Sequence, residues 1–262
     1  MSDPIVLVPQ DIVDFAVSLA DAARPVLRRY FRAPIDIDIK ADASPVTVAD
    51  REAEAAMRAL INQHRPEDGI IGEEYGNERE GADWVWVIDP IDGTKSFMTG
   101  RPIFGTLIAL LYQGLPVVGI IDQPITGDRW IGVKGQITWF NNAPTTTRSC
   151  DGLSSAVLAT TAPELLNPDE LAVFETFRKQ ARATVWGGDC YNYGLLASGF
   201  IDMVIESNLK LYDFAALVPV VEGAGGVMRD WQGHPLTASS DGKVIACGDP
   251  RMLEAILGYA VK

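Results

Sequence analysis

Histidine and cysteine are scarce in this sequence. The 262 residues include two histidines and three cysteines, so a histidine-rich metal site is excluded and a bound metal must be held by oxygen ligands. Cys150, Cys190 and Cys247 lie far apart in the chain. Their spacing argues against a zinc site of closely spaced cysteines and against a framework of disulfides. We therefore expect a protein from a reducing compartment.

Basic residues and uninterrupted apolar runs are also in short supply. The chain has 22 basic and 35 acidic residues, a net charge of −13, which argues against a broad basic surface for nucleic acid. The most apolar stretch, 103–121, is broken by glycine, glutamine and proline, and we interpret it as two strands rather than a membrane span. Asp3 stands where a secretory signal would carry Lys or Arg. The sequence predicts a cytoplasmic globular protein with no nucleic-acid or membrane partner.

The pattern of the predicted elements changes near residue 144. Before it, helical spacing covers 12–30 and a region from Thr47 onward, and strands are expected at 70–71, 84–88, 103–112, 115–122 and 129–134. We expect Pro25 to kink or end the first helix. After it, strands and helices alternate, with a helix expected over 213–222. This pattern predicts an N-terminal α+β domain over 1–144 with an antiparallel sheet, and a C-terminal α/β domain over 145–262.

Acidic side chains follow apolar elements at three places. These are Glu73 after a short strand, Asp89 and Asp92 after the strand over 84–88, and Asp213 at the start of a helix. Pro90 fixes the backbone after Asp89, so Asp89 and Asp92 can converge from two sides of a tight turn. The carbonyl of Ile91 lies between them and offers a third oxygen ligand.

The residues after this turn offer a place for an anion. The amides of Gly93, Thr94 and Lys95 can begin a helix, and free amides at a helix start attract phosphate. Magnesium prefers oxygen ligands and often bridges to a substrate phosphate. The segment can therefore supply metal ligands and a phosphate cradle side by side.

Taken one at a time, these acids also have ordinary explanations. Asp-Pro-x-Asp-Gly is common turn chemistry, and Glu73 fits a solvated loop. Asp213 fits a helix N-cap or first-turn acid, and Asp50 fits the partner of Thr47 in a capping box. Spacing alone does not bring these distant residues together.

Five blocks of sequence resemble the inositol monophosphatase superfamily of magnesium-dependent phosphatases. The blocks are Thr47–Asp50, Gly72-Glu73-Glu74, Trp86–Thr94, Tyr212–Ala216 and Glu222–Gly226. The resemblance covers nearly the whole chain. It implies a layered α-β-α-β-α sandwich, of mixed α+β and α/β character, that is usually a homodimer.

The same resemblance implies a set of site residues and a cofactor. Two or three Mg²⁺ ions would be bound by five residues, which are Glu73, Asp89, Asp92, Asp213 and, through its carbonyl, Ile91. Thr94 and Asp50 would orient the nucleophilic water, and Glu73 would assist through its metal-bound water. The amides of Gly93 and Thr94 would hold the phosphate. The family reaction is direct in-line attack by water on a phosphate monoester.

Other segments resemble the histidinol-phosphate phosphatase branch of this superfamily. They are Asp92–Phe97, Gly100–Pro102, Phe104–Thr106, Ile120–Pro124, Asp189–Tyr193 and Leu209–Asp213. Histidinol phosphate carries an ammonium group and an imidazole ring, and we expect Asp189 and Glu206 to bind the ammonium group.

Several alternatives stay open at this point. Asp189 could be a helix N-cap. Tyr191, Asn192 or Tyr193 could contact the imidazole ring, but the three could not all face one ligand from the same helix, and the two tyrosines could instead be core or interface aromatics. The substrate could instead be inositol 1-phosphate or a range of sugar phosphates. In a different class, the chain could be a non-catalytic metal-binding regulatory protein, although a scaffold would not need Thr94, Asp50 and Glu73.

Overall fold

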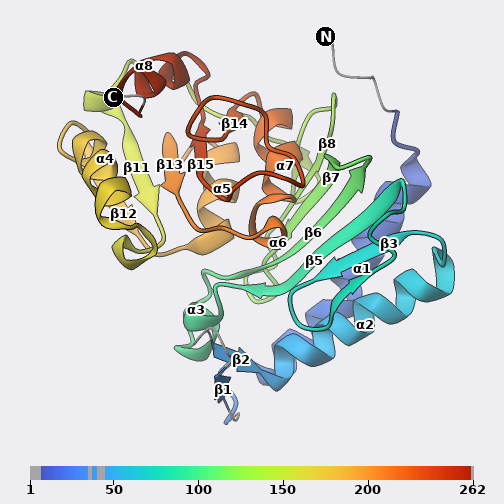
Figure 1. Ribbon diagram of the computed structural model, residues 1–262. Coiled ribbons are helices and arrows are strands. Elements are labelled where there is room, and N and C mark those ends of the chain that lie inside the picture. The colour runs from blue at the N-terminus through green and yellow to red at the C-terminus, as the bar shows by residue number, and fades with distance from the viewer. Residues whose placement is uncertain (1–6, 35–36, 40–44, 261–262) are drawn as a thin grey trace.

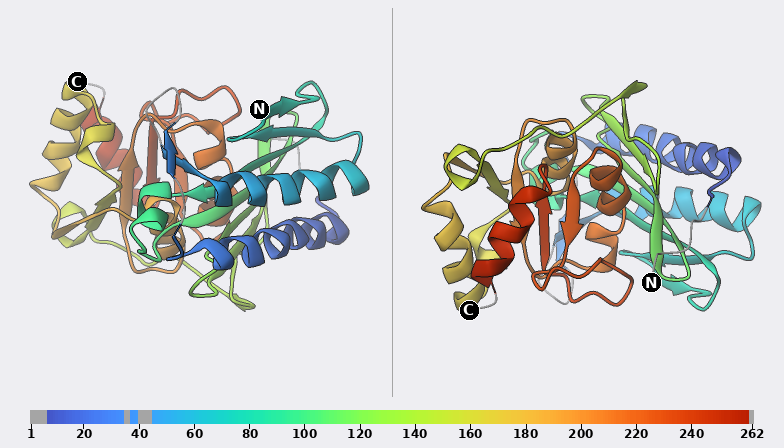
Figure 2. Two further views of the ribbon diagram at one scale, coloured as in Figure 1. Left: turned by 90° about the horizontal axis from the view of Figure 1, so that it is seen from below. Right: turned by 90° about the horizontal axis from the view of Figure 1, so that it is seen from above.

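Helices and sheets alternate in five layers. The computed structural model describes residues 7–34, 37–39 and 45–260, and within these ranges the strands form a sheet of eight, a sheet of five and a hairpin. In order, the layers are α1 (Gln10–Tyr30) with α2 (Val48–His64), the large sheet, α5 (Asp189–Ala197) with α6 (Leu211–Phe214) and α7 (Leu217–Gly223), the smaller sheet, and α4 (Pro168–Arg178) with α8 (Arg251–Ala260) (Figures 1 and 2). This arrangement confirms the predicted layered sandwich.

The large sheet is built around the predicted meander. Its order is β10 (Ala143–Pro144), β9 (Trp139–Phe140), β8 (Arg129–Val133), β7 (Leu115–Asp122), β6 (Gly105–Tyr112), β5 (Trp84–Asp92), β3 (Gly69–Gly72) and β4 (Gly76–Glu78). Strands β5 to β8 pair antiparallel, as predicted, whereas β3 lies parallel to β5. The prediction ended β5 near Asp89, but the strand continues to Asp92 with a shift of register. Pro90 lacks an N–H group, so the pairing is interrupted there without ending the strand.

The smaller sheet mixes parallel and antiparallel strands. Its order is β12 (Ala183–Trp186), β11 (Val157–Thr160), β13 (Met203–Glu206), β15 (Val244–Cys247) and β14 (Val227–Arg229). Strand β11 is parallel to both β12 and β13, while β15 is antiparallel to its neighbours. The carboxyl ends of β11 and β13 therefore lie at the same edge of the sheet.

The remaining elements are short. They are the hairpin of β1 (Ile37–Ile39) and β2 (Pro45–Thr47), the helix α3 (Thr94–Met98), and the 3-10 helices Leu153–Ser155 and Pro163–Leu165. Asp3 lies outside the described residues. Among the helices of the described ranges, none combines the length and the apolar character needed to cross a membrane.

The structure excludes one of the two effects expected of Pro25 and corrects a second helix prediction. Pro25 does not end α1, which continues to Tyr30. Ala23 and Leu27 are fully buried on either side of it, and their packing offsets the backbone bond that proline removes. The single helix expected over 213–222 is in fact α6 followed by α7. Pro219 has no N–H group to bond to the Ala215 carbonyl, so a continuous helix would lose a bond at this point.

One hydrophobic core joins the two sheets. It includes Val87 and Leu107 of the large sheet, Val204 of the smaller sheet, and Val220 of α7 between them. The large sheet ends at Pro144 and the smaller sheet begins later in the chain, but the domain boundary near residue 144 stays a prediction.

Helix α7 lies unusually close to the large sheet. A Cβ atom added at Gly119 would overlap the carbonyl oxygen of Ala216, and one added at Gly132 would overlap the backbone of Pro219. These two strand glycines therefore allow the backbone of the middle layer to contact the sheet.

Substitution of Gly119 should show how much this close contact matters. We expect Gly119→Ala to lower the free energy of unfolding by about 2 kcal/mol or more, because backbone atoms cannot move aside as a side chain can. Chemical denaturation would measure the change. The control is Gly81→Ala, where the added methyl group meets no atom within 4 Å. Equal stability of the two variants would contradict this account of the packing.

Candidate active site

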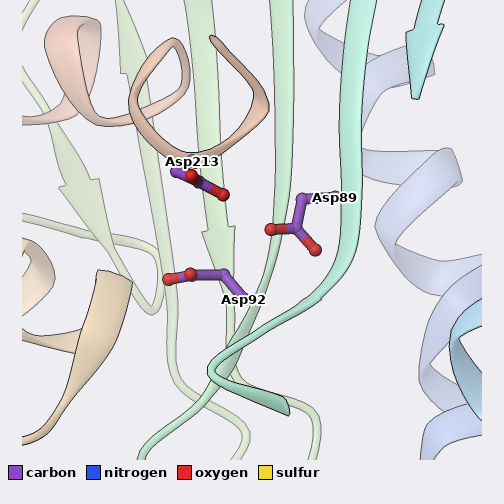
Figure 3. Close-up of side chains that lie close together, drawn as sticks. All are labelled: Asp89, Asp92 and Asp213. Carbon is purple, nitrogen blue, oxygen red and sulfur yellow. The ribbon is translucent and has the colours of Figure 1, made fainter. Parts of the chain in front are cut away.

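Three buried or half-buried aspartates meet where β5 ends. Asp89 and Asp92 come from β5, and Asp213 comes from α6. Figure 3 shows the three carboxylates gathered in one place, and one oxygen from each lies within 4.8 Å of the others. The structure thus brings together residues that are far apart in the sequence, as the family resemblance implied.

Backbone amides hold each aspartate in place. The amide of Ile91 donates to Asp89 Oδ1 at 2.9 Å, that of Cys190 to Asp92 Oδ2 at 2.5 Å, and that of Lys210 to Asp213 Oδ2 at 2.6 Å. Since these bonds come from the backbone, the positions of the carboxylates are fixed by the fold itself.

The negative charges of this cluster would be stabilised by a bound cation. Burial raises the pKa of Asp89 and that of Asp92 well above the usual range, and neighbouring carboxylates raise both further. Burial also raises the pKa of Asp213 to about 7. Ionised carboxylates this close are stable only with a counter-ion. An oxygen-only ligand set of this kind fits Mg²⁺.

Glu73 lies beside this cluster but is not one of its three members. Its charge raises the pKa of Asp50, Asp89 and Asp213, and it shares a side-chain hydrogen bond with Asp89. Its predicted role as a metal ligand stays a prediction, since the tight group contains Asp89, Asp92 and Asp213.

The turn that carries Glu73 is held by a residue that the sequence analysis missed. Glu54 of α2 is fully buried and accepts hydrogen bonds from the amides of Glu74 (2.8 Å) and Tyr75 (3.1 Å). Arg58 donates to Glu54 at 2.7 Å and also bonds to the carbonyl of Gly76. The sequence did contain a signal for this role of Glu54, because it is an acid one turn after Asp50 and lies within the apolar stripe of the helix.

Asp50 and Thr94 flank the cluster, with partners of their own. Asp50 Oδ2 accepts from the amide (2.8 Å) and hydroxyl (2.5 Å) of Thr47, which confirms the capping box. Asp50 Oδ1 is buried and has no hydrogen-bond partner among the described residues. Burial raises the pKa of Asp50 to about 6. The Thr94 hydroxyl donates to the Ile91 carbonyl at 3.1 Å.

The predicted phosphate cradle begins a short helix. Gly93 has a left-handed φ of 91° and is followed directly by α3. A Cβ atom at Gly93 would lie 2.8 Å from Asp189 Oδ2. Glycine is therefore favoured here both by its backbone conformation and by the close approach of Asp189.

A cavity of about 130 Å³ adjoins the aspartates. Its walls include Asp92 and Asp213 together with Asp189 and Glu206, the two residues expected to bind substrate. Larger hollows, of about 280 to 540 Å³, contain none of the predicted site residues. Charge, rather than size, distinguishes the small cavity.

Asp189 is the first residue of α5 and not its N-cap. The N-cap is Gly188, and no side chain caps the helix. Asp189 has a φ of 45°, a conformation that costs energy for a residue with a side chain. Burial raises its pKa to about 7, as does the nearby charge of Glu206, while Lys95 and Arg101 act in the opposite direction.

Tyr191, Asn192 and Tyr193 of α5 were the candidates for contact with the imidazole ring, and of these only Tyr193 lines the cavity. Tyr193 donates to Glu206 Oε2 at 2.8 Å. Tyr191 instead donates to Asp128 at 2.7 Å, and Asn192 donates to the carbonyl of Gly187 at 2.9 Å. The expectation that the three could not share one ligand agrees with this geometry.

Comparison with known proteins identifies the family. A family model described as the inositol monophosphatase family matches residues 9–262. The chain belongs to the inositol monophosphatase family. Enzymes of this family are phosphatases that use Mg²⁺, in agreement with the aspartate cluster.

Relatives in this family carry several different names. The bifunctional phosphatase IMPL2 of Arabidopsis thaliana, named as chloroplastic, is 53% identical over 241 residues, which are 88% of this chain and 70% of that protein. A histidinol-phosphatase of Chlorobaculum parvum is 34% identical over 89% of this chain and 91% of its own length. A solved inositol monophosphatase from Zymomonas mobilis is 54% identical, with a TM-score of 0.89 over 97% of this chain and 98% of its own.

Removing one carboxylate charge should separate metal binding from folding. We expect Asp92→Asn to lose nearly all phosphatase activity and most of the rise in melting temperature on addition of Mg²⁺, because a ligand charge is lost. The variant should still fold, since the amide can accept from Cys190. Phosphate release would measure the activity, and calorimetry with and without Mg²⁺ would measure the melting temperature. The control is Asp151→Asn, a substitution of an exposed aspartate. Retained activity would contradict the metal assignment.

The hydrogen bonds of Glu54 to the turn that carries Glu73 lead to a separate prediction. We expect Glu54→Gln to raise the Mg²⁺ concentration needed for half-maximal activity and to lower the free energy of unfolding by about 2 kcal/mol, because Arg58 loses a buried partner. A Mg²⁺ titration and a denaturation curve would measure both. Glu52→Gln is the matched control, since Glu52 lies on the same helix in a half-exposed pair with Arg29. An unchanged Mg²⁺ requirement would remove Glu54 from this role.

Proposed function

We propose that this phosphatase is a magnesium-dependent histidinol-phosphate phosphatase, which converts L-histidinol phosphate and water to L-histidinol and phosphate in histidine biosynthesis. The observation that carries the proposal is the presence of Asp189 and Glu206 in the same cavity as Asp92 and Asp213. The metal cluster does not require these two further acids. They suit a substrate that carries a positive charge close to its phosphate.

The charge balance of the cavity supports an ammonium group. Asp189 and Glu206 are close enough for the charge of Glu206 to raise the pKa of Asp189. A bound ammonium would lower both pKa values and stabilise the ionised pair. A neutral polyol would supply hydroxyl groups but no such compensation.

Each residue has a defined task in this proposal. The side chains of Glu73, Asp89, Asp92 and Asp213, with the Ile91 carbonyl, would hold the metal ions. When bound, Mg²⁺ supplies Lewis-acid activation of water and of the phosphate.

The remaining site residues would act on water and phosphate. The unpaired Asp50 Oδ1 is a buried acceptor that could orient a water together with Thr94. The amides of Gly93 and Thr94 would bind phosphate oxygens.

Relatives also support the proposal. Proteins named histidinol-phosphatase from Chlorobaculum parvum, Mycobacterium tuberculosis and Streptomyces coelicolor are 34–35% identical to this chain. These names belong to those proteins and make histidinol phosphate the first substrate to test.

A second candidate is an inositol-1-phosphate or broad sugar-phosphate phosphatase. It is favoured by the similarity to the Zymomonas mobilis inositol monophosphatase and by the word bifunctional in the name of the Arabidopsis relative. A non-catalytic regulatory role is less favoured, because Asp50, Glu73 and Thr94 all lie around the aspartate cluster. The homodimer and the cytoplasmic location stay predictions.

A parallel assay of substrates tests the proposal. With Mg²⁺ present, we expect kcat/KM for histidinol phosphate to exceed that for inositol 1-phosphate by about tenfold or more, since only the former carries a cation for the two acids. Phosphate release would be measured for both, and the chelator EDTA should abolish it. A preference for inositol 1-phosphate would favour the second candidate.

A further inference from the structure

Glu206 and Asp189 are the two acids of the cavity outside the metal cluster, and Glu206 accepts more hydrogen bonds than Asp189 does. The Glu206 side chain is at the end of β13 and is almost completely buried. Oε1 accepts from the amide of Thr161 at 2.8 Å and from the Thr161 hydroxyl at 2.5 Å. Oε2 accepts from the hydroxyl of Tyr193 at 2.8 Å.

The fold explains why these three residues meet. Register pairs Leu158 with Met203 and Ala159 with Val204 in parallel strands, so Thr161 and Glu206 stand opposite each other just where the strands end. Tyr193 reaches them from α5, one turn after Asp189 and on the same face of the helix. Both residues of that face line the cavity.

A count of lone pairs shows which atom remains available. An ionised carboxylate has about four acceptor positions, two on each oxygen. The two donors of Thr161 fill those of Oε1, and Tyr193 fills one on Oε2. Among the donors of the described residues, none takes the fourth position, which belongs to Oε2. Glu206 is one of the residues that line the cavity.

We propose that Tyr193 is a positioning residue for substrate specificity, which together with Thr161 fixes Glu206 so that Oε2 accepts a hydrogen bond from the cationic group of the substrate. This inference rests on the proposed function, because it requires a substrate with an ammonium group. Tyr193 acts through Glu206 and not on the reacting phosphate.

Burial makes this arrangement sensitive to a single hydroxyl group. Tyr193 is 1% exposed, and its ring packs in the core that joins the two sheets. Phenylalanine would keep this packing and remove only the donor. Glu206 would then be free to turn Oε2 away from the substrate, and water has little access to replace the missing bond.

The same helix supplies a matched control. Tyr191 also donates to a carboxylate, Asp128, at 2.7 Å, but neither residue lines the cavity. Tyr191→Phe and Tyr193→Phe therefore remove the same kind of bond from neighbouring positions of α5. Only the second should change how substrates are distinguished.

Steady-state kinetics on two substrates test the inference in the Mg²⁺-loaded enzyme. We expect Tyr193→Phe to raise KM for histidinol phosphate about tenfold, with kcat and the KM for p-nitrophenyl phosphate changed by less than about twofold. Tyr191→Phe should leave both KM values unchanged. Equal losses on the two substrates, or no loss on either, would overturn the inference.

A double variant tests whether Tyr193 acts through Glu206. Tyr193→Phe added to Glu206→Gln should change the ratio of the two KM values by less than about twofold beyond Glu206→Gln alone. Independent, multiplying effects would refute the positioning role. If Tyr193→Phe does not fold, Thr161→Val removes a donor to the same carboxylate and should raise KM for histidinol phosphate selectively, and an unselective effect would overturn the inference.

The wild-type enzyme separates this inference from the function on which it rests. If it does not prefer histidinol phosphate, the proposed function fails and the inference falls with it. If it does prefer histidinol phosphate but Tyr193→Phe retains the full preference, only the role of Tyr193 is rejected.

Discussion

Mutual repulsion of buried carboxylates is the constraint around which this structure is organised. Asp50, Asp89, Asp92, Asp189, Glu206 and Asp213 all lie near one region, and burial raises the pKa of each of them. No hydrophobic contact favours this gathering, so it must be imposed by the backbone. The amides that bond to the three clustered aspartates, and the extended run of β5 through Asp92, impose it.

The same constraint divides the acids into two groups, which differ in the cation that can neutralise them. Asp89, Asp92 and Asp213 form a tight group that a divalent cation can neutralise. Asp189 and Glu206 also line the cavity, and under the proposed function the cation that neutralises them would arrive with the substrate. Under that proposal, the site would bind its metal and its substrate partly for the same electrostatic reason.

Local sequence was sufficient to predict the position of some site residues but not of the others. The capping box of Thr47 depends on neighbours in the chain, and the structure confirms it. Local sequence also indicated that Asp89 and Asp92 converge, but they do so on a strand that continues to Asp92 with a shift of register, and not on the predicted tight turn. Asp213 joins the cluster only through the packing of α6 against the large sheet, which no spacing reveals. Its placement came from the family resemblance.

The errors of the sequence analysis have related causes. Pro25 and Pro219 have the same chemistry, but tertiary packing preserves the helix around Pro25, while α7 restarts close to Pro219. Glu54 was overlooked as a functional residue, and Tyr193 was considered only as a contact for the imidazole ring, because the roles of both depend on which residues they contact across the fold. Glu54 contacts a turn beyond its own helix, and Tyr193 contacts the end of a distant strand.

The shared core has a consequence for how the enzyme is made. Asp213 enters the site on α6, immediately before the helix that closes the space between the two sheets. All strands of the large sheet lie before residue 145, whereas β13 and Asp213 are synthesised later. A chain that ends before α6 therefore carries only two of the three clustered aspartates, and the full group can form only after α6 packs against the large sheet.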